Sequence, residues 1–129
     1  MSPEFLTLDD VLEMHGQQLE RYGGSPGLRD QGLLESALAQ PMATFGGEFL
    51  HEDLFAMASA YLFHLVMDHP FVDGNKRIGL LAALVFLDIN GVAIEQGTED
   101  LYELTSSVAE GRISKDQVAE RFRELAREH

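Results

Sequence analysis

Residues 52–89 read EDLFAMASAYLFHLVMDHPFVDGNKRIGLLAALVFLDI, which is two apolar stretches separated by a short polar segment. Residues 52–67 and residues 78–89 are apolar on most sides, a pattern typical of helices that lie inside a bundle. The segment between them, HPFVDGNKR at residues 69–77, combines an imidazole, a carboxylate, a glycine, an amide and two adjacent cations. The sequence therefore predicts two central helices joined by a short turn, and turns supported in this way are favoured places for function.

The first fifty residues predict two outer helices and a flap. Thr7 can cap a helix that ends at the glycine pair of residues 23–24, and a second helix is expected over residues 30–40. Residues 41–50, PMATFGGEFL, contain a proline and a glycine pair among alternating apolar side chains, which favours a loop or a short hairpin. We interpret this last segment as a candidate flap.

The last forty residues predict two further outer helices. Gly91 can end the second central helix in the left-handed conformation that glycine adopts at low cost. Thr98 can cap a helix that stops at Gly111. The spacing of Ser114 and Gln117 fits a capping box at the start of the last helix. With no convincing strand run, the simplest architecture is an all-α bundle of about six helices.

The composition limits the class of protein. A chain of 129 residues can bury the core of one domain, and we expect residues 1–129 to form a single one. Cysteine is absent, which excludes disulfides and thiolate metal sites and is compatible with a reducing cytoplasm. The 22 acidic side chains against 9 basic ones disfavour direct contact with nucleic acid. The longest apolar run, residues 78–87, is too short to span a bilayer, so we expect a cytoplasmic protein without membrane contact.

The charge pattern around the polar segment predicts an anion site. Between Asp30 and Gly111 the only lysine or arginine residues are Lys76 and Arg77, in a chain of net charge -13. Both fall in the first turn of a predicted helix, where a cation opposes the positive end of the helix dipole and costs roughly 0.3 to 1 kcal/mol. A bound phosphate supplies the missing counter-charge. Gly74 would let such a ligand approach the backbone closely.

Three further side chains of the segment suit group-transfer chemistry. His69 is able to accept a proton near neutral pH. Asp73 is a hard oxygen ligand suited to Mg²⁺, which typically takes one or two carboxylates together with substrate phosphates. Asn75 can cap the following helix while the free amides of that helix end point outward. A base, a metal ligand and a phosphate cradle together predict phosphoryl or nucleotidyl transfer to a hydroxyl.

Each of these side chains alone has a plainer explanation. A histidine before proline is often a helix-end cap, an Asp-Gly pair is often a turn, and a Lys-Arg pair often only solvates a surface. Their co-occurrence on one turn favours a site. A metal-hydrolase hypothesis would use the histidines His15, His51, His64 and His69. Because His64 and His69 are five residues apart, they do not share a helical face as zinc ligands would, and His64 is better explained as a core-edge histidine bonded to a backbone carbonyl.

The motif HPFVDGNKR is similar to the core motif of the Fic/Doc family, HPFx(D/E)GN(G/K)R. Further segments resemble the death-on-curing (Doc) branch of that family: YGGSPGLRDQGLLESALAQP at residues 22–41, ATFGGE at residues 43–48 and LVFLDINGV at residues 84–92. The resemblance thus covers nearly the whole chain. It implies a compact all-α fold in which the motif lies between two central helices and a flap aligns the target segment.

The resemblance also implies roles for the residues of the motif. His69 matches the base that takes a proton from the target hydroxyl. Asp73 matches the acidic residue that holds Mg²⁺ or helps to organise the phosphates. Phe71 matches a packing residue that anchors the loop in the core. The anion-binding turn for the nucleotide, ATP, is matched by Gly74, Asn75, Lys76 and Arg77.

Two positions separate this chain from most Fic proteins. Lys76 stands where glycine is usual, and Leu80 stands where an arginine is usual three residues after the motif arginine. The Doc branch shares both features, and resemblance to it implies a nucleotide bound in reverse, with its γ-phosphate toward the target hydroxyl. The implied activity is therefore a protein kinase acting on Ser or Thr, and Fic-type adenylylation is the alternative.

The resemblance implies a biological setting as well. Doc-like proteins are toxins of toxin–antitoxin pairs, which inhibit translation by phosphorylating elongation factor Tu and are silenced by a small antitoxin protein. A catalytically idle Fic fold that only docks a partner is a further hypothesis, and the intact His69 and Asp73 speak against it. Residues 106–111, SSVAEG, match the string (S/T)xxxE(G/N) of the inhibitory helix in many Fic proteins. Since Gly111 is explained as a helix stop, we expect this segment to be structural.

Overall fold

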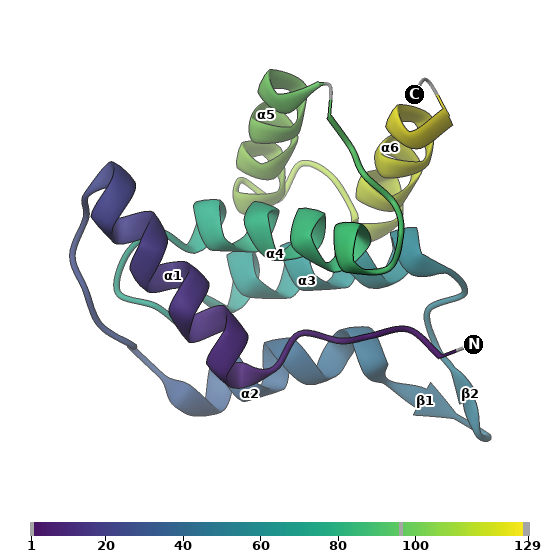
Figure 1. Ribbon diagram of the computed structural model, residues 1–129, viewed down its shortest axis with the longest axis horizontal. Helices are drawn as coiled ribbons and strands as arrows, with labels where there is room; N and C mark the ends of the chain where they lie inside the picture. The colour runs from purple at the N-terminus through teal and green to yellow at the C-terminus, as the bar shows by residue number, and fades with distance from the viewer. Residues whose placement is uncertain (1, 96, 128–129) are drawn as a thin grey trace.

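The computed structural model describes residues 2–95 and 97–127, and helices form most of this part of the chain (Figure 1). Figure 1 shows α3 and α4 side by side at the centre, with α5 and α6 on one side and α2 and the hairpin on the other. The predicted all-α fold of about six helices with a short hairpin is confirmed. The elements in chain order are α1 (Leu8–Tyr22), α2 (Gln31–Ala39), the 3₁₀ turn η1 (Gln40–Met42), β1 (Thr44–Phe45), β2 (Glu48–Phe49), α3 (Leu54–Asp68), α4 (Asn75–Ile89), α5 (Thr98–Ala109) and α6 (Lys115–Arg127).

The central helices α3 and α4 pack closely along their length. Gly79 of α4 permits this approach, because a Cβ atom there would lie only 2.9 Å from Cγ2 of Val66 on α3. The rings of Tyr61 and Phe86 meet with centroids 5.1 Å apart, and the Tyr61 hydroxyl accepts a hydrogen bond from the amide of Leu6 at 2.9 Å. Burial raises the pKa of Tyr61 to about 12, so the hydroxyl stays neutral in the core. The turn between α3 and α4 is therefore supported by two helices that pack tightly against each other.

Most of the predicted helix ends are confirmed. The Thr7 hydroxyl accepts from the amide of Asp10 at 3.1 Å, and the Asp10 carboxylate accepts from the amide of Thr7 at 2.8 Å, which completes a capping box for α1. Ser114 and Gln117 make the same reciprocal pair before α6, at 2.8 and 3.2 Å. Gly91 follows the end of α4 with a φ of 91°, the left-handed conformation expected there.

The start of α5 differs from the prediction. Thr98 is the first residue of the helix, and the cap position before it belongs to Gly97, which has a φ of 76°. A Cβ atom at residue 97 would lie 2.8 Å from Cδ2 of Leu125 on α6. Both the backbone conformation and the contact with α6 therefore favour glycine at the cap. The prediction that Thr98 caps this helix is wrong. The contact that favours Gly97 at the cap involves Leu125, which is distant in the sequence, so the local pattern could not reveal it.

α6 closes the core against the start of α3. Its apolar face, Val118, Phe122 and Leu125, is buried as predicted. Arg123 donates from Nε and Nη2 to the two carboxylate oxygens of Asp53 at 3.0 and 3.1 Å, and Asp53 is also the N-cap of α3. Among the described residues, no helix has both the length and the apolar character needed to cross a membrane.

The predicted hairpin is present, but it lies at the opposite end of α3 from the polar turn (Figure 1). α3 has 15 residues and is therefore about 22 Å long. The ring of Phe49 packs 5.6 Å from that of Phe5, which stacks at 5.7 Å on Phe86 near the end of α4. Phe45 at the hairpin tip is 83% exposed. In this conformation the hairpin does not overhang the polar turn.

Candidate active site

The polar segment forms a turn, residues 69–74, that is held by residues 24–30, which we call the strap. Two N–H groups of the strap donate to the carbonyl oxygen of Pro70, at 2.8 and 3.0 Å. The N–H of Val72 donates in return to the carbonyl oxygen of Gly27 at 3.1 Å. The turn therefore has a fixed backbone although it lies at the surface.

His69 occupies the C-cap of α3 in a left-handed conformation, with φ 50° and ψ 54°. Its Nδ1 lies 2.8 Å from the carbonyl oxygen of Val66. Because a carbonyl oxygen can only accept, Nδ1 must be the protonated nitrogen of the neutral ring, and Nε2 is left with its lone pair. The exposed side chain of His69 lines the pocket described below. The arrangement thus provides an imidazole able to take a proton at Nε2.

Asp73 presents a fixed and ionised carboxylate. Its Oδ2 accepts from the amide of Ser25 at 3.1 Å, and its Oδ1 accepts from the amide of Gly74 at 2.8 Å. These two hydrogen bonds hold the pKa of Asp73 below its ordinary value, and the nearby Arg77 charge acts in the same direction. Gly24 of the strap makes room for this carboxylate, since a Cβ atom there would lie 2.9 Å from Oδ2.

The side chain of Asn75 bonds to the backbone of the turn and does not cap α4. Its amide donates to the carbonyl oxygen of Phe71 and accepts from the N–H of Phe71, both at 3.0 Å. The prediction that Asn75 caps α4 is wrong: Asn75 is the first helical residue, and Gly74 holds the cap position with φ 80°. The main-chain N–H of Asn75, in the first turn of α4, has no partner within the helix and is available to an anion.

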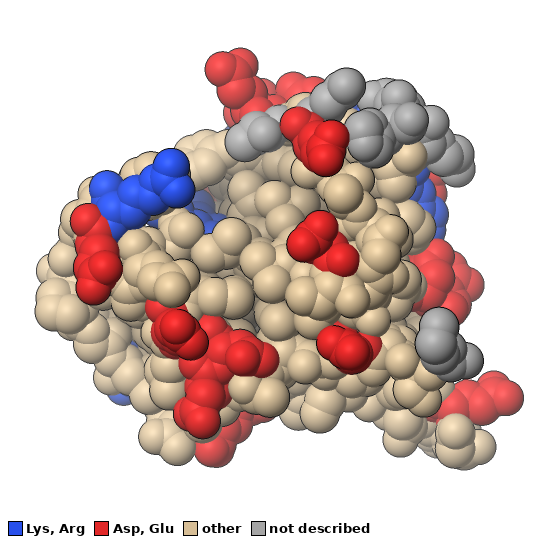
Figure 2. All heavy atoms as spheres, in the orientation of Figure 1, with Lys and Arg blue, Asp and Glu red and all other residues tan. Residues whose placement is uncertain are grey.

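Lys76 and Arg77 lie exposed in the first turn of α4, as predicted. The guanidinium carbon of Arg77 sits 4.7 Å from the centre of the Tyr22 ring, at the end of α1. Figure 2 shows a group of basic side chains at the left end of the visible face, others at its right edge, and separate groups of acidic side chains on the surface between them. The helix dipole and the two cations act in the same direction here, and both would attract an anion such as phosphate.

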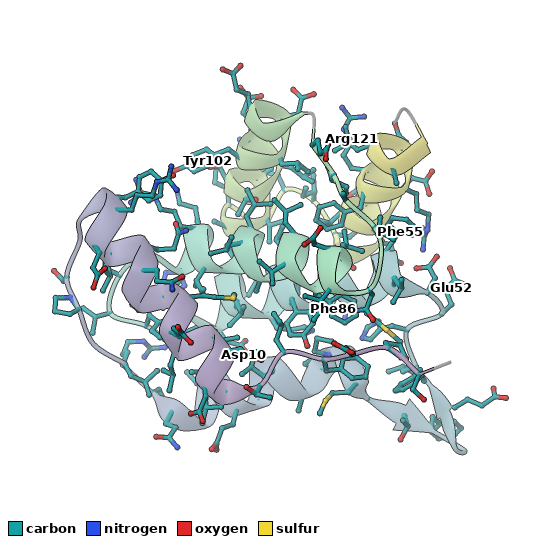
Figure 3. All side chains as sticks on the ribbon, viewed as in Figure 1. Asp10, Glu52, Phe55, Phe86, Tyr102 and Arg121 are labelled. Atoms are coloured by element: carbon teal, nitrogen blue, oxygen red, sulfur yellow. The ribbon has the colours of Figure 1, made fainter. Side chains whose placement is uncertain are left out.

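A pocket of about 500 Å³ opens beside these cations. α5 supplies its far wall through Tyr102 and Ala109, and Figure 3 shows Tyr102 reaching from α5 toward the end of α1. All six predicted site residues line it. Its lining consists of His69, Val72, Asp73, Gly74, Asn75, Lys76, Arg77, Tyr102 and Ala109.

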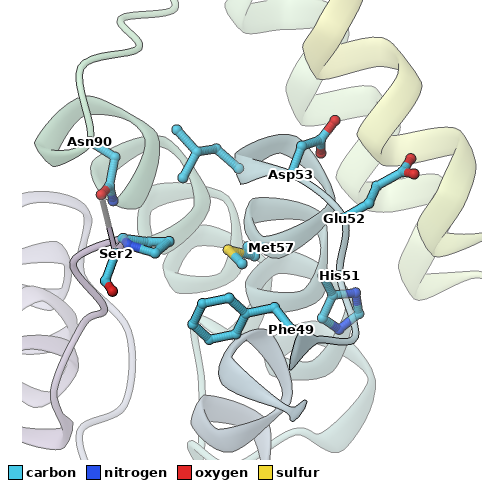
Figure 4. A pocket seen from close by; sticks show the side chains of 9 residues that line it. Ser2, Phe49, His51, Glu52, Asp53, Met57 and Asn90 are labelled. Carbon is cyan, nitrogen blue, oxygen red and sulfur yellow. The ribbon is translucent and has the colours of Figure 1, made fainter. Parts of the chain in front are cut away.

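A second, larger pocket of about 590 Å³ lies between the N-terminal segment, the hairpin and the start of α3 (Figure 4). Figure 4 shows Phe49 and Met57 inside it and the acidic side chains of Glu52 and Asp53 at its rim. None of the described residues that line it belongs to the polar turn. The smaller pocket is therefore the candidate active site, because it combines a base, a carboxylate and two cations.

His15 is a structural member of the site that the sequence did not reveal. Its ring stacks on Phe71 with centroids 3.7 Å apart and planes 12° from parallel. Its buried Nε2 donates to the carbonyl oxygen of Asp73 at 2.8 Å. His15 therefore fixes the backbone on one side of the turn, and the strap fixes it on the other. Only the fold brings α1 to residues 58 positions away, so no local pattern predicted this contact.

The histidines outside the turn have other surroundings. Nε2 of His64 lies 3.2 Å from Nζ of Lys115, rather than against the expected backbone carbonyl. Burial first, and then the charge of Lys115 and the proximity of His51, lower the pKa of His64 to about 4. Among residues 2–95 and 97–127, no three His, Asp or Glu side chains are arranged to hold a metal ion.

Fold and site together define a class: helical proteins that hold a polar turn, with an imidazole, a carboxylate and two adjacent cations, between two buried central helices. The family model described as "Fic/DOC family" matches residues 5–87. This chain belongs to the Fic/Doc family. It is 37% identical over 117 residues to "Protein kinase doc" of Escherichia phage P1, with 91% of each chain covered. It is also 37% identical over 118 residues to "Toxin Doc" of Mycolicibacterium smegmatis, with 90% of this chain and 88% of that protein covered.

Proposed function

We propose that this protein is a Doc-like toxin that transfers the γ-phosphate of ATP to a Ser or Thr hydroxyl of a protein target. Of the two relatives described above, one is named as a kinase and the other as a toxin. The observation that supports the chemistry best is the 2.8 Å contact between Nδ1 of His69 and the carbonyl oxygen of Val66. It leaves Nε2 to accept a proton beside the cationic start of α4.

In the proposed reaction, the target hydroxyl gives its proton to Nε2 of His69 while its oxygen attacks the γ-phosphorus. The bond from the γ-phosphorus to the oxygen that bridges to the β-phosphate breaks, and ADP leaves with that electron pair. The side chains of Lys76 and Arg77, with the N–H groups that begin α4, stabilise the negative charge on the phosphates.

The donor set fits a Mg²⁺ ion bound together with ATP. Asp73 is ionised, exposed and held by two backbone amides, so its carboxylate is ready to bind a hard cation without rearranging. Mg²⁺ in such sites typically takes one or two carboxylates, substrate phosphates and water. When bound, the ion would neutralise part of the phosphate charge.

Two positions favour γ-phosphate transfer over transfer of AMP. Lys76 puts a long side chain and a point charge where most family members have glycine, which limits how closely a phosphate can approach the backbone. Leu80, in place of the usual arginine, is 9% exposed and packs into the core, so this position offers no charge to a phosphate. Adenylylation is the alternative that the labelling experiment separates.

We propose elongation factor Tu as the target, inhibition of translation as the consequence, and a small antitoxin protein as the inhibitor, all in the cytoplasm. The Doc names of the two relatives support this setting. Incubation with ATP, Mg²⁺ and elongation factor Tu tests the proposal directly. Label from the γ-phosphate on the target supports the kinase, and label from the α-phosphate supports adenylylation. Neither label, over a range of targets, would favour a catalytically idle binding module.

Replacing His69 with alanine tests the base. We expect His69→Ala to lower kcat by about 10²–10⁴-fold, because general base catalysis typically contributes that much. The exposed side chain can be removed without opening a core cavity, so circular dichroism should match the parent protein. Transfer at the parental rate by His69→Ala would overturn the mechanism.

A further inference from the structure

Arg29 of the strap holds the backbone that carries His69. Its Nε donates to the carbonyl oxygen of His69 at 2.6 Å, and its Nη2 donates to the carbonyl oxygen of Asp68 at 3.0 Å. These are the last carbonyls of α3, which have no partner within the helix and form the negative end of its dipole. The planar fork of a guanidinium suits two adjacent acceptors, and an ammonium group lacks that geometry.

His69 needs such support because its conformation is unfavourable. Within the described residues, it is the one non-glycine residue with a positive φ, at 50°. A side chain in the left-handed region crowds the following carbonyl group. The bond from Nδ1 to the Val66 carbonyl fixes the ring, and the bond from Arg29 fixes the carbonyl of the same residue. The residue is thus held at both its ring and its backbone.

The strap holds the turn without the Arg29 side chain as well. The main-chain N–H groups of Arg29 and Asp30 donate to the carbonyl oxygen of Pro70, and these bonds do not depend on the guanidinium. Moreover, the side chain of Arg29 is exposed, so its removal opens no cavity in the core. The guanidinium is therefore not needed for the fold, and its role is to fix the last carbonyl groups of α3 in position.

We propose that Arg29 is a positioning residue, whose guanidinium keeps the imidazole of His69 directed into the pocket with Nε2 as its proton acceptor. This inference rests on the proposed function of His69 as a base. It adds to the turn a positioning residue from outside the motif, seven positions after the end of α1.

The test compares Arg29→Ala and Arg29→Lys with Arg121→Ala, which removes the same charge from α6, away from the turn (Figure 3). Two properties are measured on the full chain: kcat and KM for ATP with elongation factor Tu, and the imidazole ¹⁵N signals of His69 by NMR. We expect Arg29→Ala to lower kcat about 10- to 100-fold with KM for ATP within about twofold, since a displacement near 1 Å costs that much. The His69 signals should move from the Nδ1–H form toward a mixture.

Partial recovery of both properties in Arg29→Lys is expected, because a lysine restores a donor and a charge but no fork. Parental kcat and parental His69 signals in Arg29→Ala would overturn the proposal, and so would a loss of kcat with unchanged His69 signals. If Arg29→Ala does not fold, the same two measurements on Arg29→Lys decide. The NMR measurement needs no substrate, so it tests the role of Arg29 even if the parent protein transfers nothing to any target and the proposed function fails.

Discussion

At the scale of single residues, the turn contains side chains that face the pocket and side chains that hold those in place. His69 and Asp73 are exposed. A backbone carbonyl fixes one ring nitrogen of His69. Two backbone N–H groups fix the carboxylate of Asp73. Asn75 and His15 are buried and bond only to the backbone of the turn. Residue type alone does not separate the two groups, because an amide and an imidazole suit either task. Burial separates these four residues, whereas Arg29 holds the turn from an exposed position.

Substitution of Tyr22 tests how the side chain of Arg77 is held in place. The Arg77 guanidinium lies 4.7 Å from the centre of the Tyr22 ring, an attraction that at exposed sites amounts to about 0.5–1 kcal/mol. We expect Tyr22→Leu to raise KM for ATP about two- to fivefold, with little change in kcat, because Arg77 loses its support before ATP binds. Steady-state kinetics on the same target measures this. Tyr22→Phe keeps the aromatic face and should behave as the parent, so equal defects in the two variants would contradict the explanation.

At the scale of elements, α5 is the wall of the pocket, and its end contains the SSVAEG segment. Ala109 ends α5 and lines the pocket, Glu110 follows as the C-cap, and Gly111 has a φ of 75°. The carboxylate of Glu110 pairs with Nη2 of Arg112 at 2.6 Å, and both side chains are more than half exposed. In this structure the segment is a helix end with a local ion pair.

Glu110→Gly separates a structural from an inhibitory role of this segment. An exposed ion pair of this kind contributes little, so we expect transfer activity without any partner to change less than about twofold. The assay is phosphate transfer by the purified chain, with Arg112→Ala as the variant that breaks the same pair from the other side. A large rise in activity in Glu110→Gly alone would show that the glutamate inhibits the site.

The elements were predictable from the sequence where their causes are local. Helix caps such as Thr7 and Ser114 act on residues three positions away, and the HPFVDGNKR motif is one continuous string. What depends on distant contacts was not predictable. The cap at Gly97 is set by its contact with Leu125, and the support of the turn by His15 and Arg29 arises only when α1 and the strap fold against it.

At the scale of the whole molecule, charge is distributed unevenly. The formal net charge is -13. Positive charge is nevertheless concentrated at one end of the central helices α3 and α4, where α4 begins with Lys76 and Arg77 in its first turn. The net charge would repel an anionic ligand in general, and the two cations would attract it at that end. The sequence revealed this contrast because its two central cations are isolated among acids. It could not reveal that the hairpin lies a helix length away.

The contact between α3 and α6 makes the stability of the molecule depend on pH. His64 on α3 lies against Lys115 on α6, and burial, the Lys115 charge and His51 lower the pKa of His64 to about 4. The unfolded chain binds a proton at His64 below about pH 6.5, whereas the folded protein resists that proton until about pH 4. The free energy of unfolding therefore falls as the pH is lowered through this window.

We expect the free energy of unfolding of the parent protein to fall by about 1 kcal/mol between pH 7.5 and pH 5 because of His64. This value is reduced from the full linkage value because the ring is half-buried and partly screened by solvent. Urea titrations at several pH values measure it. His64→Gln, whose side chain does not titrate, should show a flatter dependence over the same window, with the remaining slope coming largely from His51, whose pKa burial also lowers. A parental slope in His64→Gln would mean that the contact between α3 and α6 is not what couples stability to pH.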